Sequence, residues 1–233
     1  MFKELKAFSI TIIKHPVFII NSAEKISVST ALTFSLFAYL QLHSRSMAQS
    51  SLFGSSVIPL RLIFLMWAAF YVEFFYGWPL TAFGIVPRTL FGLVGILTGP
   101  MLHGSLDHLV SNTVPLLFLG TVLFFFYEKI GSIVFFRSYF WTNIMVWLFG
   151  RQDSSHVGAS GVVYGLAFFL IFFGIFRRDF VSLAISIAVL ILYGGVIYGV
   201  LPTDPRVSWE SHFAGALVGV YTAIGFSSKK VVS

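Results

Sequence analysis

The chain has 233 residues, a length that in a soluble protein corresponds to one or two domains of about 150 residues each. The composition excludes that class, because only 10% of the residues are charged, 57% are hydrophobic and the mean hydropathy is +0.89. A typical soluble domain has about 25% charged residues. We therefore interpret the chain as an integral membrane protein. Since it contains no cysteine, a disulfide, a thiolate metal site and a cysteine nucleophile are also excluded.

The formal net charge of +6 is distributed as in a membrane protein and not as in a nucleic-acid-binding protein. Five basic residues fall within the first 50 positions, and most of the others flank apolar runs. This distribution follows the positive-inside rule and forms no basic groove. We expect the lipid bilayer, and no nucleic acid, as a partner.

The apolar runs predict an all-α, polytopic membrane protein with a bundle of six transmembrane helices. A spanning helix needs about 20 mostly apolar residues, because the hydrocarbon layer is about 30 Å thick and each helical residue rises 1.5 Å. Six stretches meet this requirement, at about 57–76, 105–127, 132–150, 158–176, 181–201 and 209–226.

The basic residues also predict the orientation of these helices. With the N-terminus in the cytoplasm, 12 of the 15 basic residues lie on the cytoplasmic side, and the opposite side keeps three: Arg88, Arg151 and Arg206. We therefore expect both termini inside and six crossings. The expected location is the cell membrane.

Two segments do not fit this simple scheme. Residues 26–42 form a marginal apolar run, long enough for an interfacial or a core helix, that we expect not to span the bilayer. Residues 77–104 form a long outer segment rich in glycine and proline, which is unusual unless it has a function. The expected division is an N-terminal segment of unknown role at 1–54, a membrane domain at 55–226 and a short cytoplasmic tail at 227–233.

Polar side chains gather at one depth, near the outer ends of three predicted helices. In hydrocarbon such residues are costly, so each is a candidate for function. The second, fourth and sixth helices supply them: His103, His108 and Asn112; His156 and Ser160; Glu210 and His212. We expect His156 to be a solvated loop residue.

The fourth helix opens at Gly158-Ala159-Ser160-Gly161, so Ser160 lies near unpaired backbone N–H groups and the positive end of the helix dipole. Small residues follow His212 at positions i+3, i+4 and i+7, and Gly161 and Gly165 are spaced by four. Small faces let membrane helices approach closely. If these two faces pack together, the imidazole of His212 reaches Ser160.

A serine hydroxyl becomes a good nucleophile when a base removes its proton, and neutral histidine is suited to that. No carboxylate is placed to orient His212, because Glu210 points about 200° around the helix, so a dyad is favoured over a triad. Tyr164, one turn after Ser160, is positioned to pack against the imidazole. His108 and Asn112 share a helix face, and both donate hydrogen bonds, which suits an oxyanion hole together with the Ser160 N–H.

These residues resemble the signature elements of the rhomboid intramembrane serine proteases. The elements are Gly158-Ala159-Ser160-Gly161 with Tyr164, His212-Phe213-Ala214-Gly215, and His103-x4-His108-x3-Asn112, in the same order and on the same helices as in the bacterial six-helix core. The resemblance implies that Ser160 is the nucleophile and His212 its base, with His108 and Asn112 in the oxyanion hole. It implies cleavage of transmembrane protein substrates, with Tyr164, His103, Gly158 and Gly161 in support. Many members have glycine where this chain has Ser211, another small residue.

Two other functions are compatible with parts of the pattern. A catalytically inactive rhomboid-like protein would bind membrane helices, but such relatives generally lack the serine or the histidine. A metal protein would use the histidines, but an H-E-x-x-H motif and intramembrane carboxylates are missing. We expect no metal and no cofactor, and the sequence does not indicate an oligomeric state.

Overall fold

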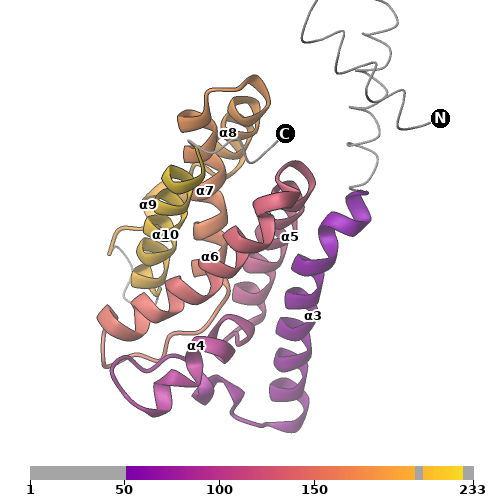
Figure 1. Cartoon of the computed structure of the whole chain (residues 1–233). Helices are drawn as coiled ribbons and strands as arrows, with labels where there is room; N and C mark the ends of the chain where they lie inside the picture. The colour runs from indigo at the N-terminus through magenta and orange to yellow at the C-terminus, as the bar shows by residue number, and fades with distance from the viewer. Residues whose placement is uncertain (1–50, 203–206, 228–233) are drawn as a thin grey trace, which may run out of the picture. The chain divides into compact units, whose positions relative to one another are not determined.

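The structure is a computed structural model that describes residues 51–202 and 207–227. The predictions for residues 26–42, for most of the N-terminal segment and for nearly all of the C-terminal tail lie outside the described residues. Six longer helices form the described bundle (Figure 1): α3 (Leu52–Tyr76), α5 (Leu106–Phe126), α6 (Glu128–Phe149), α7 (Ser160–Arg177), α8 (Phe180–Tyr193) and α10 (Trp209–Ser227).

Each of these six helices overlaps one of the six predicted stretches, and the described residues contain no strand, which confirms the all-α prediction. Three of them, α3, α5 and α7, are long and apolar enough by themselves to cross a membrane. α6 carries Glu128, Lys129 and Arg137, and α10 begins beside Glu210, which lowers their hydropathy. Glu128 and Lys129 are exposed at the first turn of α6, and the Arg137 guanidinium lies over the Phe226 ring of α10.

The fifth predicted stretch is not one continuous helix. α8 ends at Tyr193, and after Gly194 and Gly195 the chain forms a separate turn, α9 (Val196–Gly199). Glycine is a poor helix former, because its backbone loses more conformational freedom on folding than that of other residues. The glycine pair therefore explains why α8 has only 14 residues.

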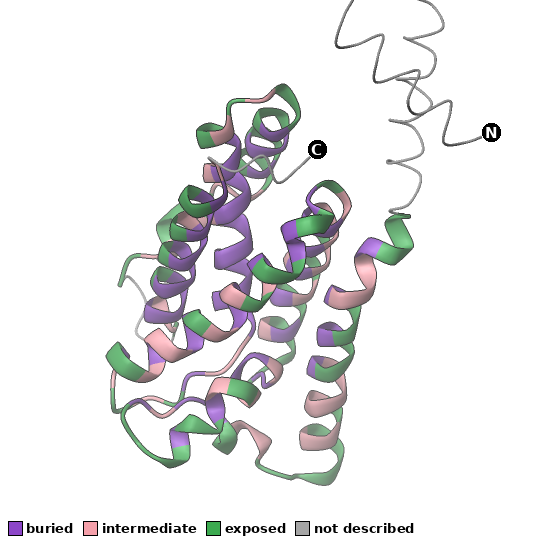
Figure 2. Ribbon diagram, viewed as in Figure 1, coloured by how far each residue is buried: buried purple, intermediate pink, exposed green. Residues whose placement is uncertain are grey.

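Helix α7 lies at the centre of the bundle and contacts α5, α6, α8 and α10. Twelve of its 18 residues are buried, and Figure 2 shows it buried along most of its length. Phe169 and Phe173 are wholly buried and stack on each other at 5.0 Å between ring centroids. This apolar core fixes the position of the helix whose first residue is Ser160.

Helices α7 and α10 approach each other through glycine faces, as the sequence predicted. A Cβ atom on Gly215 would lie 2.2 Å from the Gly161 carbonyl oxygen, and one on Gly219 would lie 2.4 Å from the Gly165 carbonyl oxygen. Both distances are far below van der Waals contact. The two backbones therefore touch directly, and residues with side chains at these positions would hold the helices apart.

The segment between α3 and α5 folds into four short helical turns: η1 (Leu80–Phe83), η2 (Phe91–Leu93), α4 (Gly95–Thr98) and η3 (Gly99–Met101). It is fastened to the segment between α6 and α7 by a pair of backbone hydrogen bonds between Ile85 and His156, at 2.9 and 2.8 Å. The Gly158 N–H also donates to the Gly99 carbonyl at 2.9 Å. The segment thus braces the chain just before Ser160.

Glu73 and Arg88 bind different parts of the chain. Glu73 accepts hydrogen bonds from the backbone and hydroxyl of Thr81, and Arg88 donates to the Leu148 carbonyl at 2.9 Å. Glu73 thereby holds the start of the segment that follows α3, and Arg88 ties the same segment to the end of α6.

Candidate active site

Ser160 is the first residue of α7, and its side chain is half-buried. The residue two positions earlier, Gly158, has φ +109°, a conformation that side-chain-bearing residues rarely adopt. A Cβ atom on Gly158 would also lie 2.6 Å from the His108 ring. Glycine is therefore needed here both for the turn into α7 and for the approach of α5. The turn presents the Ser160 hydroxyl beside the unpaired N–H groups of the first helical turn.

His212 lies in the first turn of α10, and its ring is buried. Its Nε2 atom lies 2.9 Å from the Ser160 hydroxyl oxygen, which is hydrogen-bond distance. The two residues are 52 positions apart in sequence, and the close contact of α7 with α10 brings them together.

Tyr164 packs on the imidazole of His212, as the sequence suggested. The two rings are stacked, with centroids 4.0 Å apart and planes inclined by 5°. Tyr164 lies one helical turn after Ser160, so the residue that carries the hydroxyl and the residue that supports the imidazole share one face of α7.

His108 and Asn112 come from the first two turns of α5, which Ser105 caps by accepting a hydrogen bond from the His108 N–H. The Asn112 amide donates to the His108 carbonyl at 2.9 Å, which leaves its second N–H for another acceptor. A Cβ atom built on Gly158 would lie 2.6 Å from the His108 ring and 3.7 Å from Asn112 Nδ2. Both side chains therefore border the turn that carries Ser160.

His103 lies in the segment before α5 and is 2% exposed. Its ring makes an edge contact with the His108 ring, at 4.9 Å between centroids. Burial, together with the neighbouring His108, lowers the pKa of His103 to about 4. At neutral pH His103 is therefore an uncharged packing partner of His108.

The prediction that His156 is a solvated loop residue is wrong. His156 is 3% exposed, and its Nδ1 atom lies 2.6 Å from the Ser208 hydroxyl. Burial lowers its pKa. Ser208 is the residue just before α10, so this bond joins the segment that precedes Ser160 to the segment that precedes His212.

A second link joins the same two segments. Arg151 forms an ion pair with Glu210 and also donates to the Val207 carbonyl at 3.0 Å. Glu210 is buried, with 9% of its side chain exposed, so its charge needs this partner. The sequence did not predict this pair. The available signal was that charged residues in an apolar chain tend to pair with each other.

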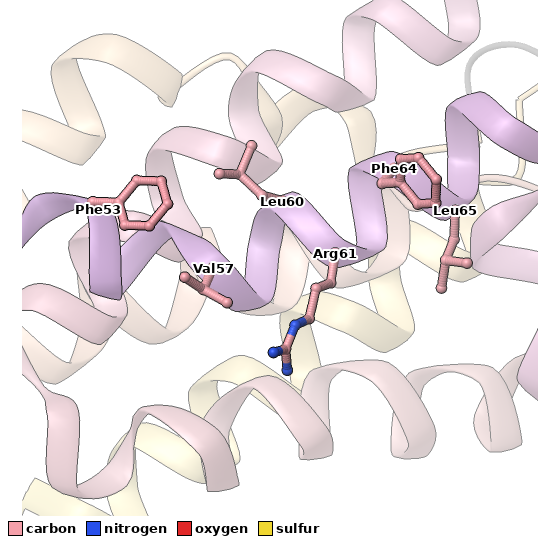
Figure 3. Close-up of a pocket in the computed structure, with 6 residues that line it drawn as sticks. All are labelled: Phe53, Val57, Leu60, Arg61, Phe64 and Leu65. Carbon is pink, nitrogen blue, oxygen red and sulfur yellow. The ribbon is translucent and has the colours of Figure 1, made fainter.

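Within the described ranges, no group of three or more histidine, aspartate or glutamate side chains is arranged to hold a metal ion. One hollow of about 480 Å³ lies away from all predicted site residues, on α3 alone (Figure 3). It is lined by Phe53, Val57, Leu60, Arg61, Phe64 and Leu65. Its lining is almost wholly apolar side chains on one exposed helix face, as expected for a surface that meets lipid.

The comparison with protein families identifies the class. The family profile described as Rhomboid domain matches residues 90–229, which is more than half of the chain. The chain belongs to the rhomboid family, and it is a multi-pass membrane protein with an all-α bundle. Members of this family are generally serine proteases.

The chain is also similar to mycobacterial proteins. The uncharacterized proteins Mb1372 of Mycobacterium bovis and Rv1337 of Mycobacterium tuberculosis are each 36% identical to it over 150 residues, which is 60% of this chain and 62% of each relative. The uncharacterized protein ML1171 of Mycobacterium leprae is 36% identical over 147 residues, 56% of this chain and 55% of that protein. The similarity thus covers less than two thirds of each of these relatives.

Proposed function

We propose that this chain is an intramembrane serine endopeptidase that cleaves transmembrane segments of other membrane proteins, with Ser160 as nucleophile and His212 as base. The observation that carries the proposal is the 2.9 Å contact between the Ser160 hydroxyl and His212 Nε2. Family membership supports the class of reaction, and the buried, aromatic-supported imidazole supports the role of His212.

In the proposed reaction, the Ser160 proton moves to His212 Nε2 while the hydroxyl oxygen attacks the scissile carbonyl carbon. The carbonyl oxygen becomes negative and accepts hydrogen bonds from the His108 side chain, the free N–H of Asn112 and the Ser160 backbone N–H. One donor of this kind typically stabilises the transition state by about 2.7–4 kcal/mol. His212 then gives its proton to the leaving amine, and the same base activates the water that hydrolyses the acyl-enzyme.

The substrate must be locally unwound at the cleavage site, because the carbonyl of a helical residue is hydrogen-bonded within its own helix. We therefore propose single transmembrane segments with helix-weakening residues as substrates. The proposed setting is the cell membrane, with both termini cytoplasmic and the site toward the outer face. The proposed catalytic domain is residues 55–226, flanked by an N-terminal segment at 1–54 and a tail at 227–233.

The test is cleavage of a fluorogenic transmembrane peptide by the full chain, purified in detergent and reconstituted in liposomes. Ser160→Ala and His212→Ala should each abolish turnover while the thermal unfolding temperature stays close to that of the wild type. Ser155→Ala is the matched control, because this exposed serine lies in the segment just before α7 and should leave turnover unchanged.

A fluorophosphonate probe gives a second, independent measurement. It should label the wild type at Ser160 and fail to label Ser160→Ala. Turnover that survives Ser160→Ala, or labelling at another residue, would contradict the assignment. A folded wild-type protein that binds the peptide without cutting it would instead favour the inactive helix-binding function.

A further inference from the structure

The second ring nitrogen of His212 faces a backbone carbonyl. His212 Nδ1 lies 2.9 Å from the carbonyl oxygen of Gly199, the last residue of α9. A carbonyl oxygen only accepts hydrogen bonds, so this contact requires the proton on Nδ1. In the neutral ring Nε2 then has a free lone pair, and Nε2 is the atom beside the Ser160 hydroxyl. The contact with Gly199 thus selects the tautomer that accepts a proton from serine.

Among the neighbours of His212, the Gly199 carbonyl is the group placed to hold the proton on Nδ1. Tyr164 lies against the face of the ring, where it fixes the ring plane but reaches neither nitrogen in that plane. Glu210, two residues before His212, pairs with Arg151. The in-plane contacts of the imidazole are therefore the serine on one side and the backbone carbonyl on the other.

The approach of α9 to the ring depends on residue 199 being glycine. A Cβ atom there would lie 1.8 Å from the Tyr164 hydroxyl oxygen and 3.0 Å from its Cζ atom. The same atom would lie 3.5 Å from His212 Nδ1. A larger residue would therefore push α9 away from the stacked Tyr164 and His212 rings, and the carbonyl would move out of hydrogen-bond range.

We propose that the Gly199 carbonyl is the third member of the catalytic arrangement, where it orients His212 as the carboxylate does in a serine protease triad. It holds the proton on Nδ1 in the resting site. After Nε2 takes the Ser160 proton, the Nδ1–H bond to the carbonyl keeps the imidazolium in place until Nε2 protonates the leaving amine. Gly199 is a positioning residue, and its role rests on the proposed protease function.

The first test measures the tautomer without any turnover. The protein is labelled with nitrogen-15 histidine and carries Ser160→Ala, so that the Gly199 carbonyl is the remaining in-plane contact of His212. The His212 signals are assigned by their loss in Ser160→Ala/His212→Gln. We expect a protonated Nδ1 and an unprotonated Nε2 at neutral pH. A dominant Nε2-protonated ring would overturn the proposal.

The second test weakens the carbonyl itself. Replacing Val200 by α-hydroxyvaline converts the Gly199 carbonyl to an ester, which is a poorer acceptor. We expect kcat to fall roughly three- to tenfold, the effect of one hydrogen bond, with KM unchanged. The matched control replaces Leu201 by α-hydroxyleucine. Each change removes one N–H that bonds to the Tyr198 carbonyl, that of Val200 or that of Leu201, but only the first converts the Gly199 carbonyl to an ester.

Equal activity of the two ester variants would overturn the role of Gly199.

A third comparison uses the steric fit of residue 199 against Tyr164. Gly199→Ala should lower kcat at least tenfold. Gly199→Ala/Tyr164→Phe should recover part of that loss, because the hydroxyl nearest to the new Cβ is gone. If the wild type shows no turnover, the tautomer measurement in Ser160→Ala and in the Val200 ester still decides whether Gly199 orients His212. Only the protease proposal then fails.

Discussion

The substitution Gly215→Ala tests whether direct contact between α7 and α10 sets the distance from Ser160 to His212. The new Cβ would lie 2.2 Å from the Gly161 carbonyl oxygen, whereas ordinary contact begins near 3.4 Å. The helices must therefore separate by about 1 Å at this level. Gly215 lies one turn after His212, and Gly161 lies next to Ser160. The 2.9 Å contact between the two side chains would stretch to about 3.9 Å, beyond hydrogen-bond range.

We expect kcat for a fluorogenic transmembrane peptide to fall about 100-fold, since a misplacement of 1 Å in catalytic groups has an effect of that size. Overpacking of this kind costs roughly 1–3 kcal/mol of stability, so the unfolding temperature in detergent should also fall. Gly225→Ala is the control, because it lies on the same helix and its Cβ would meet nothing within 4 Å. It should keep the wild-type rate and be at least as stable.

Gly219→Ala separates the effect on stability from the effect on geometry. Its Cβ would lie 2.4 Å from the Gly165 carbonyl oxygen, one turn farther from His212. It should lose about as much stability as Gly215→Ala but less activity. A Gly215→Ala protein that turns over within threefold of the wild type would refute the idea that backbone contact sets the dyad distance.

Four further predictions follow from the same structure. Asn112→Ala should lower kcat by about two to three orders of magnitude with little change in KM, because it removes one oxyanion donor. Tyr164→Ala should lower kcat more than Tyr164→Phe, because only the alanine variant loses the stacked ring, an interaction worth about 0.5–1.5 kcal/mol. Arg151→Met should lower the unfolding temperature more when it is made in the wild type than when it is made in the Glu210→Gln variant. Only in the wild type does it leave the buried Glu210 carboxylate unpaired. The pKa of His103 is about 4, against a usual value of 6.5, so the unfolded chain takes up a proton at this residue before the folded chain does. Folding is therefore disfavoured as the pH falls from about 6.5 to 4. Between pH 7 and 4.5 the wild type should lose more stability than His103→Gln, by at most about 3 kcal/mol.

The sequence was sufficient to predict the six helices and the meeting of α7 with α10. Long apolar runs have few stable alternatives in a membrane, because every backbone group must be hydrogen-bonded within a helix or a closed barrel. The glycine faces at Gly161, Gly165, Gly215 and Gly219 then left one evident way for two helices to pack closely. The proximity of Ser160 and His212 followed from that packing.

Other features could not be predicted, for two physical reasons. The Gly199 carbonyl has no side-chain signature, since every residue carries a carbonyl and only the path of α9 brings this one to His212. The partners of Arg151, His156 and Glu210 depend on how the segments outside the helices fold, and hydropathy patterns do not describe those segments. The same limit explains the wrong expectation for His156.

A neutral carbonyl suits the proposed reaction at this position better than a carboxylate would. In the proposed mechanism His212 is the neutral base of the resting site. A carboxylate on Nδ1 would then be a buried charge without a charged partner for most of the catalytic cycle, and desolvation of such a charge costs several kcal/mol. The buried carboxylate of Glu210 already has a cation, Arg151. A backbone carbonyl selects the same Nδ1-protonated tautomer without that cost. It stabilises the transient imidazolium less than a full negative charge does, which places more of the catalytic demand on the oxyanion donors His108 and Asn112. The proposal therefore predicts that loss of Asn112 lowers kcat more than conversion of the Gly199 carbonyl to an ester.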